Sequence, residues 1–277
     1  MTRSTEFVPS GVISLTTDFG HKGPFIGTMK GQILSRFHDA KIVDITHECS
    51  VHWPDEAGFW ISRSYRYFPT GTVHLAVVDP GVGTRRDIIG LVLEGHVFLA
   101  PDNGLLTPLV ESAPGCRVFS LDAAARKRFG ITTVSATFHG RDIFAPLAAE
   151  IAAGRHRPDD LGPPAVDLVP SLLEEPLVTG GRIKGVIVTV DNFGNLISNI
   201  DQSLVATFGH PRVTAAGHRI AFAKTYGAVQ PGEYLALINS FGVLEIARAE
   251  QSASSGLGLE RGAPVLVEDA DPSRPGP

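Results

Sequence analysis

The first part of the chain alternates short β-branched runs, such as VISLTT and KIVDIT, with segments of helical periodicity. One such segment carries an apolar helix face formed by Phe25, Met29, Ile33 and Phe37. Strands that alternate with helices are typical of a mostly parallel sheet covered by helices. The pattern therefore predicts an N-terminal α/β domain over residues 11–160.

Polar residues in this domain gather where strands end. Strands are predicted at residues 12–17, 41–46, 72–79, 88–95, 96–102 and 117–122, and helices at 24–38, 53–68 and 141–154. Ligands of open α/β sheets collect beyond the carboxyl ends of the strands. The polar residues at such ends are Asp18, Thr46, His47, Asp79, Asp102 and Asn103.

The pattern changes in a proline-rich stretch without periodicity, which predicts a linker over residues 161–181. Residues 182–268 then contain short alternating strands separated by glycine, proline and asparagine turns, without a convincing helix. We expect a small all-β domain there, antiparallel and barrel-like. The polar, proline-rich tail at residues 269–277 is predicted to be disordered.

Composition and charge narrow the possible partners. With 43% hydrophobic and 19% charged residues, the 277-residue chain has the composition of a globular protein. A net charge of −5 provides no basic field for a nucleic-acid backbone, so we expect no nucleic-acid partner. We see neither a signal peptide nor an apolar run of about 18 residues that could span a membrane. Cys49 and Cys116 lack metal-ligand spacing, which favours a reducing cytoplasm.

The densest chemical signal is the stretch VVDPGVGTRR, in which an apolar strand stops at Asp79 and turns through proline and glycines. Such a turn exposes the carboxylate, and glycines permit close backbone approach, so the loop could enclose a ligand and direct Arg86 toward Asp79. The alternative is a plain tight turn in which Asp79 bonds to its own loop. The spacing does not match a phosphate-binding loop.

Two histidines are further candidates. His139, in TFHGRD just before a predicted helix, could act as an acid, a base or a water-orienting group, or could be structural. His47, in DITHE, could form a metal site with Asp44 and Glu48, although no H-E-x-x-H motif supports that idea.

Two turns of the second domain carry groups that read ligands. DNFGN at residues 191–195 combines a carboxylate, amides and an aromatic ring. NSFG at residues 239–242 is a similar polar turn between two predicted strands. Either turn could equally be ordinary hairpin chemistry.

Taken together and in order, the motifs of the chain resemble those of the S-adenosyl-L-methionine hydroxide adenosyltransferases, hydrolase relatives of the fluorinating and chlorinating enzymes. These motifs are TTDFG, VVDPGVGTRR, APDNGLLT, TFHGRDIFAP, DNFGN and NSFGVLEIA, and the resemblance runs from about Ile13 to Val267. It implies the same two-domain order and a homotrimer with the active site between subunits. It implies no cofactor and no metal, because S-adenosyl-L-methionine is itself the substrate.

The resemblance also implies catalytic roles. Asp79, Arg86 and His139 would hold and activate a water molecule, with Asp79 accepting a hydrogen bond or proton and His139 orienting the nucleophile. The water or hydroxide would attack C5′ of the ribose in line and displace methionine, leaving adenosine. Alignment of the reacting atoms would then be the main task of the protein.

The remaining matches would bind the substrate. Asp18 would accept hydrogen bonds from both ribose hydroxyls, Phe193 would lie against adenine and Asn195 would read its edge. Asp191 would suit the methionine ammonium group. The other expected contacts are Phe138, Gly140, Ser240, Phe241 and Arg248.

Departures from the halogenating relatives favour water as the nucleophile. Asp79 stands where those enzymes have a tyrosine and Gly140 where the fluorinating enzyme has a halide-contacting serine, and a carboxylate repels halide. Gly23 and Phe241 replace an acid and an arginine near the methionine end. The resemblance therefore does not say how the methionine amine and carboxylate are held. The alternatives are a non-catalytic adenosine or S-adenosyl-L-methionine sensor, a halogenase, and a metal-dependent hydrolase using Asp44, His47 and His139.

Overall fold

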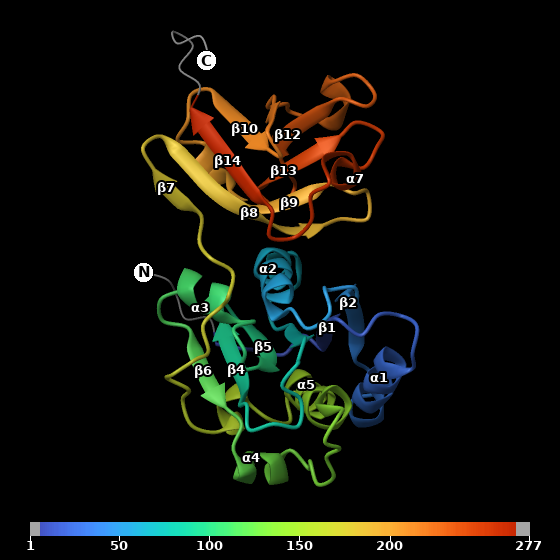
Figure 1. Cartoon of the computed structure of the whole chain (residues 1–277). Coiled ribbons are helices and arrows are strands. Elements are labelled where there is room, and N and C mark those ends of the chain that lie inside the picture. The colour runs from blue at the N-terminus through green and yellow to red at the C-terminus, as the bar shows by residue number, and fades with distance from the viewer. Residues whose placement is uncertain (1–5, 270–277) are drawn as a thin grey trace. The chain divides into compact units, whose positions relative to one another are not determined.

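The computed structural model describes residues 6–269. The chain divides into two compact units, Met1–Leu173 and Glu174–Pro277, called unit 1 and unit 2 (Figure 1). The predicted boundaries at residues 160/161 and 181/182 stay a prediction. Most of the tail predicted at residues 269–277 lies outside the described residues, and Asp269 is the last residue of a strand.

Unit 1 is built on a six-stranded sheet of order β2-β1-β3-β5-β4-β6. β2, β1, β3 and β5 pair in parallel, whereas β4 is antiparallel to both of its neighbours. The strands are β1 (Val12–Thr17), β2 (Lys41–Thr46), β3 (Val73–Val77), β4 (Ile88–Leu93), β5 (His96–Pro101) and β6 (Arg117–Ser120). The prediction of an α/β domain with a mostly parallel sheet is confirmed.

Helices cover both faces of this sheet (Figure 1). The alternation of side chains along a strand sends Leu15, Leu75 and Leu99 to one face, where they pack against α1 and α5. Ala76 and Phe98 point to the other face and pack against α2 and α3. The helices of unit 1 are α1 (Phe25–Arg36), α2 (Pro54–Ser64), α3 (Thr107–Ser112), α4 (Ala123–Arg128) and α5 (Ala145–Ala152).

Unit 2 is an antiparallel sheet that curls toward closure. Its order is β11-β10-β14-β8-β9-β13-β12, with β7 paired to β8. A bridge between Phe222 and Ala236 connects the segment after β11 to β12, so the two ends of the sheet meet. The strands are β7 (Leu177–Thr179), β8 (Arg182–Val190), β9 (Leu196–Asp201), β10 (Pro211–Ala215), β11 (His218–Ile220), β12 (Tyr234–Ile238), β13 (Val243–Arg248) and β14 (Pro264–Asp269). The predicted barrel-like β domain is confirmed.

Four short helices depart from the predicted elements. The expectation that the second domain has no helix is wrong, because α6 (Gln202–Val205) and α7 (Ala253–Leu257) form there. Each is a single turn capped by a preceding side chain, so it is too short to give a periodic signal. In unit 1, α3 and α4 were not predicted for the same reason of length.

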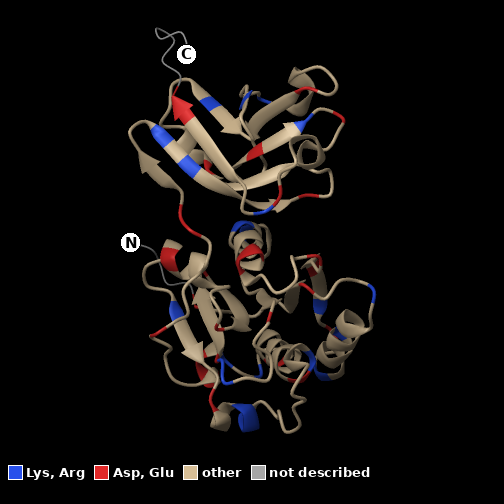
Figure 2. Cartoon of the chain, viewed as in Figure 1, with Lys and Arg blue, Asp and Glu red and all other residues tan. Residues whose placement is uncertain are grey.

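Acidic and basic residues are interspersed along both units (Figure 2). Within residues 6–269, no helix is both long and apolar enough to cross a bilayer. Cys49 is buried, Cys116 is half-buried, and both are free thiols.

Candidate functional site

The sheet of unit 1 brings the predicted acids to one edge. β1 and β3 are parallel neighbours in which Thr17 pairs with Val77, so Asp18 and Asp79 leave the sheet from adjacent strand ends. Asn103, just beyond β5, donates from Nδ2 to the carbonyl of Val78 at 2.9 Å. The carboxyl ends of β1, β3 and β5 therefore form the floor of the candidate site.

Arg86 joins Asp79 to His139. Its Nε lies 2.9 Å and 3.0 Å from the two carboxylate oxygens of Asp79, and its Nη2 also donates to Asp79 Oδ2. The same Nη2 lies 2.9 Å from Nδ1 of His139. The side chains of Asp79 and Arg86 are only 4% and 10% exposed, so this ion pair is shielded from solvent. The structure thus assembles the three residues into one hydrogen-bonded unit.

Gly83 allows the Asp79 loop to approach the segment before His139. Its φ is +77°, and a Cβ at this position would lie 2.2 Å from the carbonyl oxygen of Ala136. Only glycine fits such a contact at such a φ without strain. The glycine-rich turn therefore does more than reverse the chain, because it also seats the loop against residue 136.

His139 is buried at the start of a π-helical turn, Gly140–Phe144. A π turn inserts one extra residue into a helix and is frequent at functional sites. Burial, and then the nearby guanidinium of Arg86, lower the pKa of His139. A guanidinium has only donors, so Nδ1 must accept from Arg86 and the proton of the neutral ring lies on Nε2.

Aromatic side chains line the flank of the site next to His139. The ring of Phe138 lies 5.8 Å from that of Phe19 and 5.5 Å from that of Phe25, measured between centroids. A Cβ on Gly140 would lie 3.1 Å from Met29 Sδ and 3.3 Å from the rings of Phe138 and Phe19. Packing therefore also disfavours a side chain at position 140. This reason for a glycine is separate from the preference for water over halide that was inferred from the sequence.

Asp18 is held by the backbone of a neighbouring turn. Its Oδ2 accepts from the His52 N–H at 3.0 Å. The preceding residue, Thr17, hydrogen-bonds through Oγ1 to Nδ1 of His47 at 2.9 Å and accepts from the Phe19 N–H at 3.2 Å. His47 therefore supports the turn that presents Asp18.

The metal-site alternative is not supported by the arrangement of its residues. Asp44 Oδ2 is paired with Lys30 Nζ at 2.6 Å, so a lysine already balances the charge of this carboxylate. His47 Nε2 lies 3.1 Å from Asp44 Oδ1, so the imidazole also contacts this carboxylate. Across residues 6–269, no three His, Cys, Asp or Glu side chains are grouped to hold a metal ion.

The DNFGN turn of unit 2 is ordered by its own aspartate. Asp191 Oδ1 accepts from the backbone N–H groups of Phe193 and Asn195 at 2.9 Å, and Oδ2 accepts from Asn195 Nδ2 at 3.0 Å. Asn195 is buried, whereas Phe193 is 77% exposed. These bonds support the turn interpretation of the motif, with Asp191 ordering the turn. Its ligand interpretation stays a prediction.

The second predicted turn of unit 2 lies elsewhere. In the β9–β13 pair, Leu196 faces Ile246 and Asp201 faces Val243. The turn at residues 191–195 therefore precedes one end of β9 and the turn at 239–242 adjoins the other end. A bulge in β9 leaves only three residue steps of β13, about 10 Å, between these two ends. Glu245 lies between the turns: its Oε2 accepts from Asn239 Nδ2 at 3.2 Å, and burial, followed by the charge of Asp191, raises its pKa.

Arg248 lies at the same end of β13 as the DNFGN turn. Its Nε donates to the carbonyl of Gly232 at 2.9 Å, and its guanidinium lies 5.1 Å from the centre of the Tyr234 ring. Two supporting residues, Asn103 and Asp142, were given no role from sequence, and His47 was considered only as a metal ligand or as one residue of a metal-dependent hydrolase. Asn103 and Asp142 bond to backbone groups, which no motif reveals, and His47 bonds to the side chain of Thr17.

Comparison with known proteins places this geometry in a family. Residues 13–162 match the model of the SAM hydroxide adenosyltransferase N-terminal domain, and residues 185–266 match that of the C-terminal domain. An (R)-S-adenosyl-L-methionine hydrolase of Thermus thermophilus is 35% identical, over 91% of this chain and 97% of its own. One of Salinispora tropica is 34% identical, over 94% and 98%.

A solved structure shares the fold. The crystal structure of an uncharacterized conserved protein from Thermotoga maritima aligns with a TM-score of 0.85 and 34% identity. The alignment covers 92% of this chain and 99% of that one. The chain belongs to the SAM hydroxide adenosyltransferase family.

Proposed function

We propose that the chain hydrolyses S-adenosyl-L-methionine to adenosine and L-methionine. The observation that carries the proposal is the buried unit in which Arg86 contacts both Asp79 and His139. The names of the relatives, which are S-adenosyl-L-methionine hydrolases, support the same substrate.

The reaction is an in-line displacement at C5′ of the ribose. A bond forms between the water oxygen and C5′ while the bond from C5′ to sulfur breaks, and its electron pair stays on sulfur. Methionine leaves as a neutral thioether, so the leaving group needs no proton. The protein then has to align water, carbon and sulfur, which supplies about 7–11 kcal/mol of barrier reduction in favourable cases.

The hydrogen bonds support a different proposed role for each of the three residues. His139 offers the Nε2–H as a donor, because its Nδ1 is occupied by Arg86, so it orients the water rather than removing its proton. Asp79 is the acceptor for the water proton, since a carboxylate oxygen can accept from more than one donor. Arg86 fixes both partners and favours hydroxide through its permanent charge.

Substrate binding is assigned to the other matched residues. Asp18 has one carboxylate oxygen on the His52 N–H and would bind the ribose hydroxyls. Phe138 and Gly140 would flank C5′, and Phe193, Asn195 and Arg248 would contact adenine. Ser240 and Phe241 would contact the methionine end, with Asp191 near its ammonium group. We propose no metal and no cofactor.

Product chromatography tests the function. Purified protein incubated with S-adenosyl-L-methionine should give adenosine and methionine in equal amounts, without halide and in the presence of a chelator. Intact substrate after long incubation, with tight adenosine binding by calorimetry, would instead identify a sensor. A 5′-halogenated adenosine formed with chloride or fluoride would identify a halogenase.

The family resemblance extends the proposal to a cytoplasmic homotrimer whose sites lie between subunits. Sedimentation would measure the assembly, and subunit exchange would test the shared site. Asp79→Ala and Phe193→Ala subunits should each be inactive and should regain part of the activity when mixed. Mixed subunits that remain inactive would place each site within one chain.

A further inference from the structure

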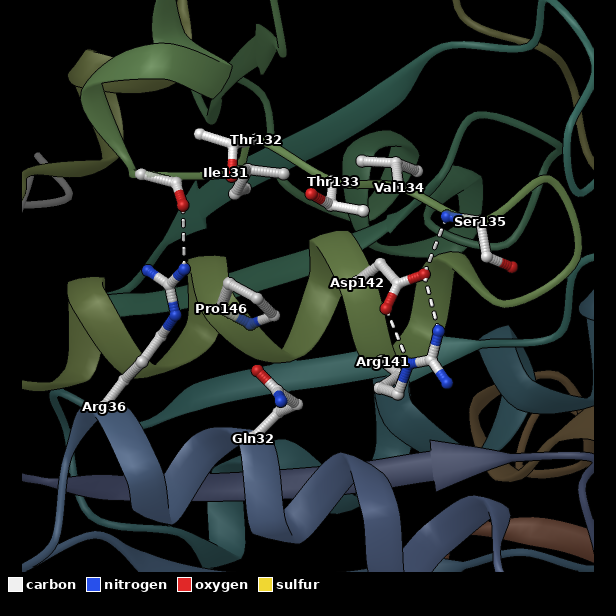
Figure 3. Close-up of a pocket in the computed structure, with 11 residues that line it drawn as sticks. Gln32, Arg36, Ile131, Thr132, Thr133, Val134, Ser135, Arg141, Asp142 and Pro146 are labelled. Carbon is white, nitrogen blue, oxygen red and sulfur yellow. Dashed lines mark hydrogen bonds and ion pairs between the residues drawn. The ribbon is translucent and has the colours of Figure 1, made fainter.

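Asp142 connects two parts of the segment that carries His139. Its Oδ2 accepts a hydrogen bond from the Ser135 N–H at 2.8 Å. Its carboxylate also accepts from Arg141 Nε at 2.6 Å and Nη2 at 3.0 Å. Figure 3 shows these residues together in the wall of a groove of about 340 Å³. The Asp142 side chain is largely buried, and the hydrogen bond from Arg141 is the main cause that lowers its pKa.

The segment that Asp142 holds has no regular structure of its own. Residues 131–138 form neither helix nor strand, so their backbone groups depend on side chains and turns for hydrogen bonds. Arg36 fixes the start of this segment through the carbonyls of Phe129 and Gly130, at 2.8 Å and 3.0 Å. Asp142 fixes it at Ser135, immediately before the residue that touches the Asp79 loop.

Two contacts join this segment and the adjoining His139 to the Asp79 loop. Ala136 packs its carbonyl against Gly83, and His139 accepts a hydrogen bond from Arg86. The bond from Ser135 to Asp142 spans both contacts, because it ties the chain just before Ala136 to the turn just after His139. It therefore fixes the spacing between the two points at which the loop is seated.

We propose that Asp142 is a positioning residue that sets the distance between His139 and Arg86 through its bond to the Ser135 backbone. The proposal rests on the hydrolase function proposed above. It assigns Asp142 no contact with the substrate or with the reacting atoms. Arg141 would serve Asp142 by balancing its charge.

Kinetics with three variants test the proposal. Asp142→Ala removes the acceptor, Asp142→Asn keeps an acceptor oxygen without the charge, and Asp122→Ala removes a comparable bond to a backbone N–H at the start of α4. We expect kcat to fall about 10- to 100-fold in Asp142→Ala, because misplacement by about 1 Å can cost that much. KM should change little, and Asp142→Asn should recover most of kcat. Asp122→Ala should lower Tm while kcat is unchanged.

Two kinetic results would overturn the proposal. One is an Asp142→Ala variant that behaves like Asp122→Ala, with a lower Tm and unchanged kcat. The other is an Asp142→Asn variant as slow as Asp142→Ala, since charge rather than the bond to Ser135 would then matter.

Nitrogen NMR of His139 gives a readout that needs no activity. Its ring signals can be assigned by their loss in His139→Gln. We expect the Nε2–H form in wild type and Asp142→Asn, and a mixture of both neutral forms in Asp142→Ala because Arg86 no longer holds Nδ1. An unchanged spectrum in Asp142→Ala would contradict the positioning role. If wild type forms no adenosine, the hydrolase proposal fails and this spectrum alone decides the role of Asp142.

Discussion

Arg86 Nη2 lies 2.9 Å from Nδ1 of His139. Nδ1 is therefore not available to take a proton from a water molecule. Because a guanidinium can only donate, this contact fixes the neutral form of His139 with its proton on Nε2. In the proposed mechanism His139 is then a donor toward the nucleophile. Asp79, on the other side of Arg86, is the proposed acceptor of the proton.

Replacing Asp79 with asparagine tests its role as the acceptor. Asp79→Asn should lower kcat by about 100- to 10,000-fold, the range for a lost acid or base. It also leaves the buried Arg86 without its counter-charge, which should lower the free energy of unfolding by about 3–5 kcal/mol. Product assays and denaturant unfolding measure both effects. Asp87→Asn, the same change at the exposed neighbour of Arg86, should alter neither, and a wild-type kcat in Asp79→Asn would exclude the role.

Replacing Arg86 with lysine separates charge from geometry. A lysine keeps the positive charge but has no planar fork that reaches Asp79 and His139 together. We expect a loss in kcat of about 10-fold or more for a missing transition-state contact of about 1.4 kcal/mol. Arg85→Lys, the same change at the exposed neighbouring residue, is the matched control. Equal activity in the two lysine variants would show that charge alone suffices.

The pH dependence of activity should reflect neutral His139. Burial and Arg86 lower its pKa below the ordinary 6.5. The ring therefore stays neutral, which is its active form, when the pH falls to 6.5. The acid limb of the profile of kcat/KM should therefore lie below pH 6.5. An acid limb at or above pH 6.5 that disappears in His139→Gln would mean that burial and Arg86 do not lower the pKa of His139.

Gly83 should tolerate no side chain. Gly83→Ala brings a Cβ to 2.2 Å from the Ala136 carbonyl at a φ of +77°, so the loop must shift. We expect a loss of about 10- to 100-fold in kcat, as for a misplacement of about 1 Å. Gly115→Ala shares a positive φ, +95°, but meets no atom within 4 Å, and should cost stability only. Similar activity in the two variants would show that the contact with Ala136 does not position the loop.

Unit 1 should lose stability in acid because of a buried histidine pair. His74 is fully buried, with Nδ1 2.7 Å from Ser14 Oγ and Nε2 3.1 Å from His96 Nδ1. Burial and His96 lower its pKa to about 3. The unfolded chain therefore binds a proton that the folded chain resists between pH 6.5 and about 3, so stability falls as the pH falls through that window.

Denaturant unfolding at two pH values measures this effect. The contribution of His74 should decrease by about 2 kcal/mol between pH 7.5 and pH 5. His74→Phe keeps a ring against Phe98 and should flatten the pH dependence, whereas the exposed His38→Gln should leave it unchanged. An equal slope in wild type and His74→Phe would contradict the assignment.

The sequence predicted most elements but not the order of the sheet. β1 and β2 have the predicted bounds because β-branched runs and flanking turn residues are local signals. The position of β5 between β3 and β4 depends on non-local pairing. The hairpin that joins β4 to β5 turns at Glu94 and Gly95, both with positive φ, and lacks the usual Asn-Gly or Asp-Gly signal.

The site could be predicted in part for a similar reason. Asp79 and Arg86 share one loop, so their contact was within reach of the sequence. His139 lies 53 residues after Arg86, and only the ordered motifs of the family linked it to them. The bond from Asp142 to the Ser135 backbone was not foreseen, because a backbone donor leaves no mark in the sequence.

The most direct test of the central claim is mass spectrometry of the products formed in water labelled with heavy oxygen. If water attacks C5′, purified protein should place one labelled oxygen in adenosine, at the 5′ position, and none in methionine. Asp79→Asn should form almost no labelled adenosine. Adenosine without label, label in methionine, or the absence of adenosine from wild type would contradict attack by water on C5′.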